Sequence, residues 1–370
     1  MTQVRTTIVT SIMAPHRIAL FNSLAADPAI DLTVIYLAET DPSRHWSVRQ
    51  NEMKFRHVVL TERARFGRAE GFLHLTTGLR PALGRSRPQA LIVGGWDQPA
   101  YHEARAYAWA TGSRLLWWVE STLRDRRSEG RSARSLKRSL IASADGVVVP
   151  GQASTDYVRS LGATDDRIWV APNAVDNESF RLVAPDRTDR RGSVRFLFVG
   201  RFTSSKGIAS LLDAWMGVKT DAYLSLVGAG DLADPILRRI SATSTERVDV
   251  VGHLERDDLA KAYADADVFI FPSVSDPWGL VINEAMASGL PVIASDAPGA
   301  VADLVTDGEN GLIVEAFDPA SLAAAMSRLA LDRDLRLGMG RRSADRIKSF
   351  EPANWAAGMR RAVVTATEAS

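Results

Sequence analysis

Short apolar runs alternate with longer stretches of helical periodicity along almost the whole chain. Many of the apolar runs are rich in β-branched residues, and in the helix-like stretch Arg17–Ala25 the apolar side chains Ile18, Phe21 and Leu24 fall on one face. This alternation is typical of βαβ units, which build parallel sheets. In the first half we predict strands at Thr6–Thr10, Leu32–Leu37, His57–Leu60, Ala90–Val93, Arg114–Val119, Gly146–Pro150 and Ile168–Ala171. In the second half we predict strands at Arg195–Val199, Tyr223–Val227, Val248–Val251, Val268–Phe271, Pro291–Ala294 and Leu312–Val314, with helices at Ile208–Trp215, Asp257–Ala264 and Leu280–Ser288.

A polar segment divides this pattern into two halves. Leu182–Ser193 carries Pro185 and Gly192 and has the composition of a linker rather than of a core. We therefore expect an N-terminal domain over residues 1–183, a C-terminal domain over 192–350 and a further helix within 351–370. That helix, Pro352–Ala366, either completes the second domain or crosses back to the first.

The strongest local signal is the run from Phe196 to Gly207. A buried strand leads to Gly200, where backbone can approach a ligand, and a helix that begins near Ile208 adds N-terminal amides that favour anions. Arg201 and Lys206 supply positive charge for a diphosphate. Gly207 stands where a P-loop would carry Ser or Thr, so a P-loop NTPase is disfavoured. The alternative is an ordinary strand-to-helix loop with two solvated cations.

A second signal runs from Pro272 to Ala294. A strand ends at Pro272, and a loop leads through Asp276 and Gly279 to a helix that carries Glu284. A carboxylate one turn into such a helix can accept hydrogen bonds from both hydroxyls of a ribose, and an acid in the preceding loop can reach a sugar. Asp276 as a helix cap and Glu284 as a surface acid are the alternatives.

Composition and charge narrow the classes of function. The 45 Lys and Arg nearly balance the 44 Asp and Glu, so the net charge of +1 gives no reason to expect a nucleic-acid partner. There is no cysteine, and the six His show no metal-ligand spacing, so we expect no metal site. No apolar run reaches the roughly 18 residues of a membrane span. We expect a cytoplasmic protein and leave peripheral membrane contact open.

Four segments of the chain resemble the family 4 retaining glycosyltransferases. They are Phe196–Gly207, Pro272–Ala294, Ala171–Phe180 and Val251–Leu254. The likeness runs through nearly all of the second half and continues more loosely in the first half from Ala144–Val149. The resemblance implies an α/β protein of the GT-B fold, with two Rossmann-like domains facing across a cleft and a C-terminal helix that returns to the N-terminal domain. It implies a nucleotide-sugar as co-substrate, with neither cofactor nor metal.

The resemblance also implies roles for individual residues of the second half. Arg201 and Lys206, with Gly200, would hold the donor diphosphate, and Glu284 would hold the ribose diol. The amides of Gly279, Leu280 and Val281 would meet sugar or phosphate oxygens. The base pocket would be lined by Gly228, Gly230, His253 and Leu254.

The chain departs from the family pattern at two acidic positions. The pattern has two Glu separated by seven residues, and here the first is Asp276, whose shorter side chain shifts the charge by about one methylene. A first-half motif of the family usually offers a His, where this chain has Glu120 after the run Trp117–Val119. We predict Glu120 as an active-site residue, whether base, sugar contact or acceptor orienter. The alternative is an acid partly exposed at a strand end.

Two other loops of the first half follow predicted strands and should face the same site. His16 and Arg17 follow the first strand, where either could contact acceptor or donor phosphate, although a lone His is more often structural. Asp97 follows the strand that ends at Val93 and is a candidate for hydroxyl recognition. We include Glu120, Asp276, Asp97 and His16 as the catalytic candidates.

A basic run stands apart from these motifs. Seven cations crowd the segment Arg124–Arg138, and four of them, Arg127, Arg131, Arg134 and Arg138, fall on one helical face. The run could bind anionic lipid headgroups or an anionic acceptor. A solvated face is the more common explanation.

The function we predict is transfer of a hexosyl group from a UDP- or GDP-sugar to an acceptor hydroxyl, with retention at the anomeric carbon. The acceptor, whether glycan, lipid-linked or a small natural product, is held mainly by the N-terminal half. Because fold does not fix chemistry, two alternatives stay open. One is a nucleotide-sugar epimerase or hydrolase of the same fold, and the other is a non-catalytic partner subunit that binds sugar nucleotides.

Overall fold

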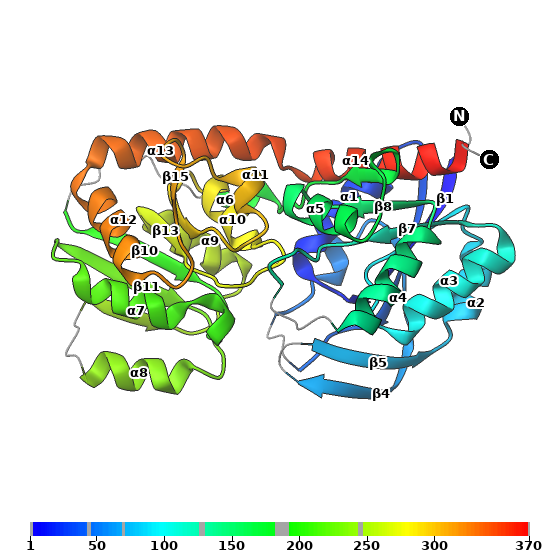
Figure 1. Cartoon of the computed structure of the whole chain (residues 1–370), viewed down its shortest axis with the longest axis horizontal. Coiled ribbons are helices and arrows are strands. Elements are labelled where there is room, and N and C mark those ends of the chain that lie inside the picture. Colours follow the sequence, from blue (N-terminus) through cyan, green and yellow to red (C-terminus); the bar gives the residue numbers. More distant parts are fainter. Residues whose placement is uncertain are drawn as a thin grey trace. The chain divides into compact units, whose positions relative to one another are not determined.

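A computed structural model describes residues 3–42, 46–68, 71–125, 130–181, 192–242 and 247–368 (Figure 1). The chain divides into two compact units. Unit 1 comprises Met1–Leu123, Arg127–Asn173 and Pro352–Ser370, and unit 2 comprises Arg124–Arg126 and Ala174–Glu351. Each unit is an α/β layer structure around a parallel sheet, as the sequence predicts. Most of the predicted linker, residues 182–191, lies outside the described residues.

Unit 1 is built on a seven-stranded parallel sheet in the order β3-β2-β1-β6-β7-β8-β9. The central strands β1, β6 and β7 are almost wholly buried because helices cover both faces. The strands are β1 (Val4–Ile12), β2 (Ile30–Ala38), β3 (Arg56–Val59), β6 (Ala90–Val93), β7 (Arg114–Trp118), β8 (Gly146–Val149) and β9 (Ile168–Val170). The helices are α1 (Pro15–Ala25), α2 (Leu79–Ser86), α3 (Pro99–Thr111), α4 (Arg131–Ala142), α5 (Gln152–Ser160) and α14 (Pro352–Glu368).

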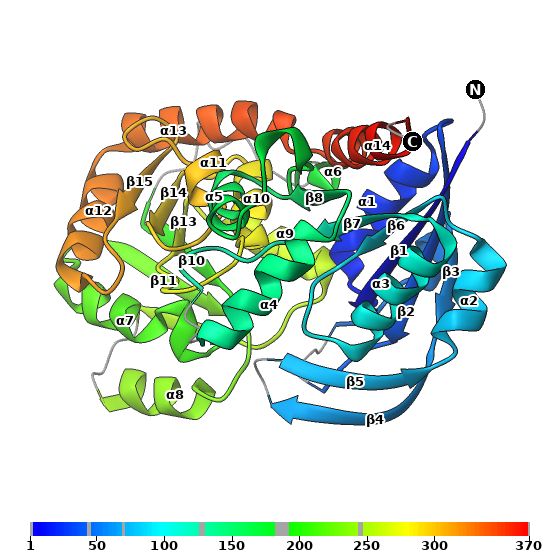
Figure 2. The same cartoon turned by 45° about the vertical axis from the view of Figure 1, so that its right-hand side comes forward.

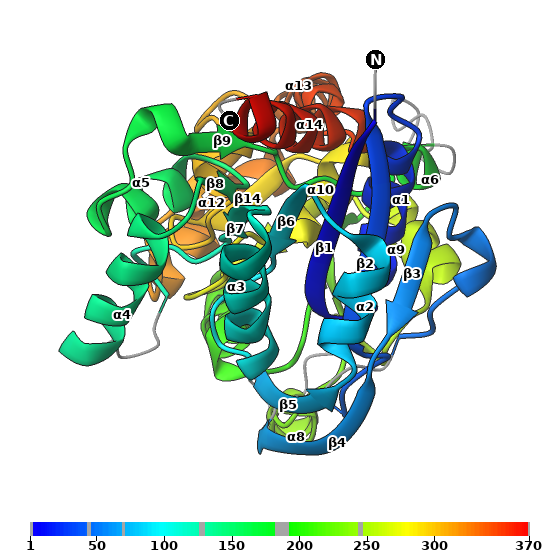
Figure 3. The same cartoon turned by 90° about the vertical axis from the view of Figure 1, so that its right-hand side faces the viewer.

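Unit 1 also contains a β-hairpin that the apolar pattern does not reveal. Strands β4 (Thr61–Arg68) and β5 (Gly71–Thr77) pair antiparallel as a separate two-stranded sheet between β3 and α2, seen at one end of the unit in Figure 3. The prediction placed no element between Leu60 and Ala90. Both strands mix charged, polar and apolar residues and are largely exposed on one face, so they lack the apolar run that marks the buried strands.

Unit 2 is built on a six-stranded parallel sheet in the order β12-β11-β10-β13-β14-β15. Figure 2 labels five of these strands, β10, β11, β13, β14 and β15. Its strands are β10 (Val194–Val199), β11 (Ala222–Val227), β12 (Val248–Val251), β13 (Val268–Phe271), β14 (Val292–Ser295) and β15 (Gly311–Val314). Its helices are α6 (Asn177–Arg181), α7 (Ile208–Gly217), α8 (Ala233–Ala242), α9 (Arg256–Asp265), α10 (Leu280–Ala287), α11 (Val301–Leu304), α12 (Pro319–Leu331) and α13 (Arg333–Arg346). Every strand predicted from the sequence is present, with ends that differ by at most two residues.

The strand order of each sheet fixes where a ligand can bind. In unit 1 the order reverses between β1 and β6, and in unit 2 it reverses between β10 and β13. Loops leaving the carboxyl ends of two such strands diverge, which opens a crevice at that edge of the sheet. Most of the candidate residues follow these four strands, whereas Glu120 follows β7 and the base-pocket candidates follow β11 and β12.

The last helix, α14, packs within unit 1 although it follows unit 2 in the sequence. The ring centroid of the buried Trp355 lies 5.7 Å from that of Phe21 on α1 and 5.6 Å from that of Trp118 on β7. Gly358 lets the helix approach β9, because a Cβ there would lie 2.4 Å from the carbonyl oxygen of Val170. Among the helices that the structure describes, none has both the length and the apolar character to cross a bilayer.

Candidate functional site

In unit 2 the loops that follow β10 and β13 are in direct contact. Gly207 has a φ of 69°, and a Cβ on it would lie 1.9 Å from the carbonyl oxygen of Pro272. The carbonyl of Ser205 accepts hydrogen bonds from the Val274 amide at 2.8 Å and from the Ser273 hydroxyl at 2.9 Å. Only glycine fits this approach, so the sequence fixes the position of the short helical turn Ser204–Lys206 against the end of β13.

This contact brings Lys206 to Asp276. The Lys206 ammonium lies 2.6 Å from Oδ2 of Asp276, and the two side chains are only 12% and 18% exposed. Oδ1 of Asp276 accepts the Trp278 amide at 3.1 Å, so both carboxylate oxygens have partners. Arg201, on the loop directly after β10, is partly buried. Asp276 thus holds the lysine that the resemblance assigns to the diphosphate.

Helix α10 begins at the same edge of the sheet. Gly279 precedes it with a φ of 100°, and Leu280 and Val281 form its first turn. The first amides of a helix have no partner within the helix and favour negative charge. The loop before the helix is held in place by the Trp278 indole, which donates to the Asn283 side chain at 2.8 Å.

Glu284 lies one turn into α10 and is linked to α9. The Tyr263 hydroxyl donates to Oε2 of Glu284 at 2.8 Å. Loss of hydration raises the pKa of the Glu284 carboxyl from 4.5 to about 7, although the hydrogen bond from Tyr263 and the charge of Arg256 act in the opposite direction. The charged form of Glu284 is therefore costly until a ligand supplies further hydrogen bonds.

The predicted base-pocket residues follow β11 and β12. A Cβ on Gly228, which has a φ of 144°, would lie 1.9 Å from the Gly200 carbonyl oxygen, and one on Gly230 would lie 2.6 Å from that of Phe202. The structure therefore brings Gly200, Gly228 and Gly230 together. His253, whose side chain is 40% exposed, follows β12 together with Leu254.

Unit 1 carries a second cluster at the β1–β6 switch point. Arg17, in the first turn of α1, donates from Nη1 to the Thr10 hydroxyl at 2.8 Å and from Nη2 to Glu120 Oε2 at 3.4 Å. Its guanidinium lies 4.5 Å from the ring centroid of Trp118. The other oxygen of Glu120 accepts from the Asn173 amide at 3.2 Å. Glu120 is therefore held from two sides, and its side chain is still 32% exposed.

Sequence reasoning did not find Thr10 or Asn173 as partners in this cluster. Thr10 lies within β1, and Asn173 follows β9, so their partners Arg17 and Glu120 come from other elements. Two signals could have indicated Asn173: its position after the carboxyl end of a strand, and its place in the segment Ala171–Phe180 that carries part of the resemblance.

Asp97 and His16 occupy the same edge of the unit-1 sheet. Asp97 is exposed on the loop after β6. The pKa of the buried Tyr101 lies above its ordinary value, mainly because of burial and secondly because of the negative charge of Asp97. Arg17 and Glu120 act on Tyr101 as well, so these groups are gathered around it. His16 is partly buried, with its ring edge-on to that of Trp46 at 6.2 Å.

The cations of the basic run that the structure describes differ in their surroundings. Arg124 pairs with Asp296, at 2.7 Å from Nη1 to Oδ2, and residues 126–129, which include Arg127, lie outside the described residues. On α4, Arg134 donates to the Ser160 carbonyl at 3.2 Å, and Lys137 donates to the Tyr157 hydroxyl at 2.9 Å. Arg131 and Arg138 are exposed, as is Leu136. Within the part of the chain that the structure covers, no group of three or more His, Asp or Glu could hold a metal ion.

Comparison with known proteins finds a family match within unit 2. Residues 193–332 match the family described as glycosyl transferases group 1, so unit 2 contains such a domain. Over 229 residues the chain is 32% identical to the D-inositol 3-phosphate glycosyltransferase of Xylanimonas cellulosilytica, a match that covers 57% of this chain and 55% of that relative. The chain spans about half the length of the named relatives it matches.

Two solved structures are similar over nearly the whole chain. Sucrose-phosphate synthase from Thermosynechococcus elongatus has a TM-score of 0.75 at 20% identity, over 99% of each chain. HepE from Anabaena, solved in complex with UDP and glucose, has a TM-score of 0.77 at 16% identity, over 98% of this chain and 100% of that one. The fold of two Rossmann-like units is therefore GT-B, as the resemblance implied.

Proposed function

We propose that this protein, whose second unit contains a group 1 glycosyl transferase domain, is a retaining glycosyltransferase of family 4. It moves a hexosyl group from a UDP- or GDP-sugar to an acceptor hydroxyl. The observation that carries the proposal is the grouping of Lys206, the amino end of α10 and Glu284 at the switch point of the unit-2 sheet. The cation suits a diphosphate, the helix amides suit the oxygens of a sugar, and the carboxylate suits the hydroxyls of a ribose.

The chemistry follows from the charge that develops on the donor. When the bond between the anomeric carbon and the phosphate oxygen breaks, negative charge collects on the diphosphate, and Arg201, Lys206 and the α10 amides stabilise it. The acceptor oxygen attacks the same face of the oxocarbenium-like sugar, and its proton passes to the departing phosphate. Because these groups supply the positive charge, we propose that no metal ion is required.

The acceptor would bind to unit 1, near Glu120. Arg17 and Asn173 fix the direction of the Glu120 carboxylate, which suits it to orient an acceptor hydroxyl. Asp97 at the same edge would contact further hydroxyls. Asp276, held by Lys206, would contact the transferred sugar through the same carboxylate that aligns the lysine.

The comparisons support the donor class without naming the acceptor. The named relatives are glycosyltransferases, and HepE was solved with UDP and glucose.

Contact of the exposed α4 residues Arg131, Leu136 and Arg138 with an anionic membrane surface stays a prediction.

A donor panel tests the proposal. The purified protein is incubated with UDP- and GDP-linked hexoses, with and without a chelator, and the products are scored by mass spectrometry. Slow release of the nucleoside diphosphate from one donor, unaffected by the chelator, is the expected result. If no donor is consumed and neither UDP nor GDP binds in calorimetry, the protein is not a transferase of this kind. Epimerised donor would indicate the epimerase alternative.

A further inference from the structure

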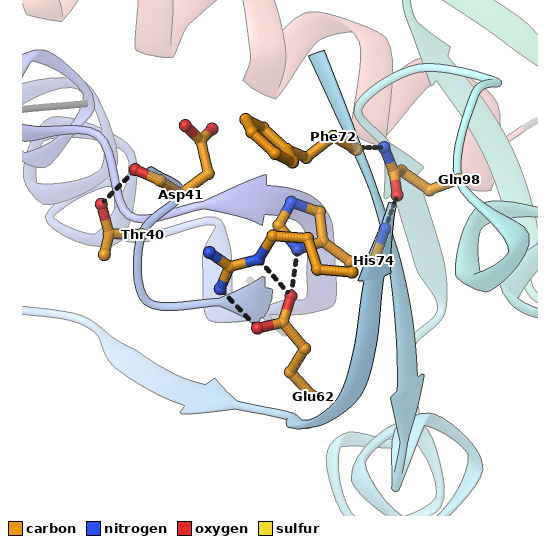
Figure 4. Close-up of polar contacts among 7 residues, drawn as sticks. Thr40, Asp41, Glu62, Phe72, His74 and Gln98 are labelled. Carbon is orange, nitrogen blue, oxygen red and sulfur yellow. Dashed lines mark hydrogen bonds and ion pairs between the residues drawn. The ribbon is translucent and has the colours of Figure 1, made fainter. Parts of the chain in front are cut away.

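Polar side chains from three separate segments of unit 1 meet beside the β4–β5 hairpin. Asp41 follows β2, Glu62 and Arg65 lie on β4, and His74 lies on β5. Figure 4 shows Glu62 and His74 pointing toward one another. Because β2 and β3 end at the carboxyl edge of the sheet, the hairpin that directly follows β3 begins at the edge that carries Glu120.

Gln98 fixes the hairpin to this edge. It is only 3% exposed, and it follows β6, directly after Asp97. Its Oε1 accepts the backbone amide of His74 at 2.8 Å, and its Nε2 donates to the Phe72 carbonyl at 2.8 Å (Figure 4). One buried side chain therefore sets the position of β5 relative to the candidate acceptor residue Asp97.

Glu62 and Arg65 are held rigidly on the hairpin. Arg65 donates from Nε to Oε1 of Glu62 at 2.9 Å and from Nη2 to Oε2, while Nδ1 of the buried His74 lies 2.6 Å from Oε1. The hydrogen bond from Arg65 is the main reason why the pKa of Glu62 is lowered. The two charged side chains nevertheless remain 23% and 27% exposed. The carboxylate of Glu62 and the guanidinium of Arg65 therefore present hydrogen-bond acceptors and donors to solvent in fixed positions.

The charges on the face of the hairpin that carries Glu62 and Arg65 do not favour an anion. Glu62 balances Arg65, and Asp41, which is 8% exposed, adds a second negative charge that acts on the same guanidinium. Fixed carboxylates accept from hydroxyl groups, and a guanidinium donates to them. Phe72, two residues before His74, lies on the same face of β5 and is partly exposed. An aromatic ring beside such groups suits a sugar ring, which has an apolar face and hydroxyl edges.

We propose that this face of the hairpin, formed by Glu62, Arg65 and Phe72, is an acceptor subsite for a neutral sugar ring. Gln98 and His74 act as positioning residues. The inference rests on the proposed transferase function and adds the acceptor class to it.

Saturation-transfer NMR with the full chain tests the subsite. The probes are the methyl glycosides of glucose, galactose and mannose, with glucose 6-phosphate as the anionic counterpart. We expect wild type to bind at least one methyl glycoside, and Glu62→Gln and Arg65→Gln to weaken that binding about tenfold, as for loss of one charged hydrogen bond. Arg63→Gln on the same hairpin is the matched control, because Arg63 bonds to Thr77, at 3.3 Å, instead of to Glu62.

Gln98→Ala tests positioning. It should lower methyl glycoside binding while the affinity for UDP or GDP, which belongs to unit 2, stays unchanged, a split that general unfolding does not give. The subsite is overturned if wild type binds no methyl glycoside, if Arg63→Gln and Arg65→Gln weaken binding equally, or if glucose 6-phosphate binds better than the neutral sugars. Failure of the proposed function is a separate result, because it appears as absent diphosphate binding and donor turnover.

Discussion

Glu284, which we propose binds the donor ribose, lowers the stability of the folded protein when it is ionised. Its pKa in the folded state, about 7, is above the ordinary 4.5, so between these pH values the folded state holds a proton that the unfolded state has lost. The free energy of unfolding therefore falls as pH rises through this range. Glu284→Gln should remove that cost and stabilise the protein above pH 7 by up to about 3 kcal/mol, with little change below pH 4.5. Urea unfolding at both ends of the range measures this.

The same variant should bind the donor more weakly. A ribose is held best by the ionised carboxylate, so wild-type affinity for the nucleotide-sugar that the donor panel identifies should rise as pH passes through about 7. Glu284→Gln should show no such rise, and calorimetry across this range compares the two. A variant that is less stable than wild type above pH 7 would mean that the hydrogen bond from Tyr263 outweighs the desolvation of the carboxyl.

Lys206 and Asp276 should affect diphosphate binding in opposite directions. Lys206→Met removes a charge-assisted contact, which costs about 1.5 to 3 kcal/mol of UDP or GDP affinity. Asp276→Asn removes a negative charge 2.6 Å from the ammonium, so the diphosphate should bind as well as before or more tightly, while turnover falls. Calorimetry and donor turnover on both variants decide the matter. Equal losses of affinity would show that the pair binds the diphosphate as one unit.

Arg17 should matter for transfer but not for donor binding. Arg17→Lys keeps the charge but cannot reach Thr10 and Glu120 together while stacking on Trp118, so the transfer rate should fall at least about tenfold. The control is Arg114→Lys, because Arg114 pairs with Asp145 at 2.9 Å at the opposite end of β7. If both variants changed the transfer rate equally, Arg17 would have no specific role in transfer.

At the scale of elements, the site depends on loops that touch through glycine. Gly207→Ala or Gly228→Ala would place a Cβ 1.9 Å from a backbone carbonyl oxygen, in a region of φ that alanine avoids, so each should cost more than about 3 kcal/mol and weaken diphosphate binding. Gly252→Ala is the control, since no atom lies within 4 Å of the added Cβ. Thermal unfolding compares the three. Similar melting temperatures would mean that the loops separate at little cost.

The sequence revealed the elements that are buried on both faces and missed those that are not. Strand β13 is apolar throughout and β10 is apolar except for Arg195, so their positions and the loops after them could be predicted. The β4–β5 hairpin could not, because Arg63 and Arg65 interrupt its apolar residues. Nor could the pairing of Arg17 with Glu120, since 103 residues separate them and only the strand order β1-β6-β7 brings them together.

At the scale of the whole molecule, unit 1 depends on a helix that comes after unit 2. Trp355→Ala leaves a cavity where a fully buried indole packs against Phe21 and Trp118, which costs about 3 to 5 kcal/mol. Trp109→Ala, at a position 90% exposed, should leave stability unchanged. We expect calorimetric scans of Trp355→Ala to show earlier melting of unit 1, while UDP or GDP binding to unit 2 persists at low temperature. Loss of both at once would show that the units unfold as one.

The place of α14 also has a consequence for the order of events on the ribosome. Apart from Arg124–Arg126, unit 2 is one continuous segment, Ala174–Glu351, whereas unit 1 lacks its last helix until residues 352–368 have been translated. Unit 2 can therefore fold without α14, although it is synthesised after most of unit 1. Until α14 is added the surface that receives Trp355 is open, and a chain truncated after Glu351 should hold a complete unit 2 beside an incomplete unit 1, whose exposed apolar surface would bind a chaperone.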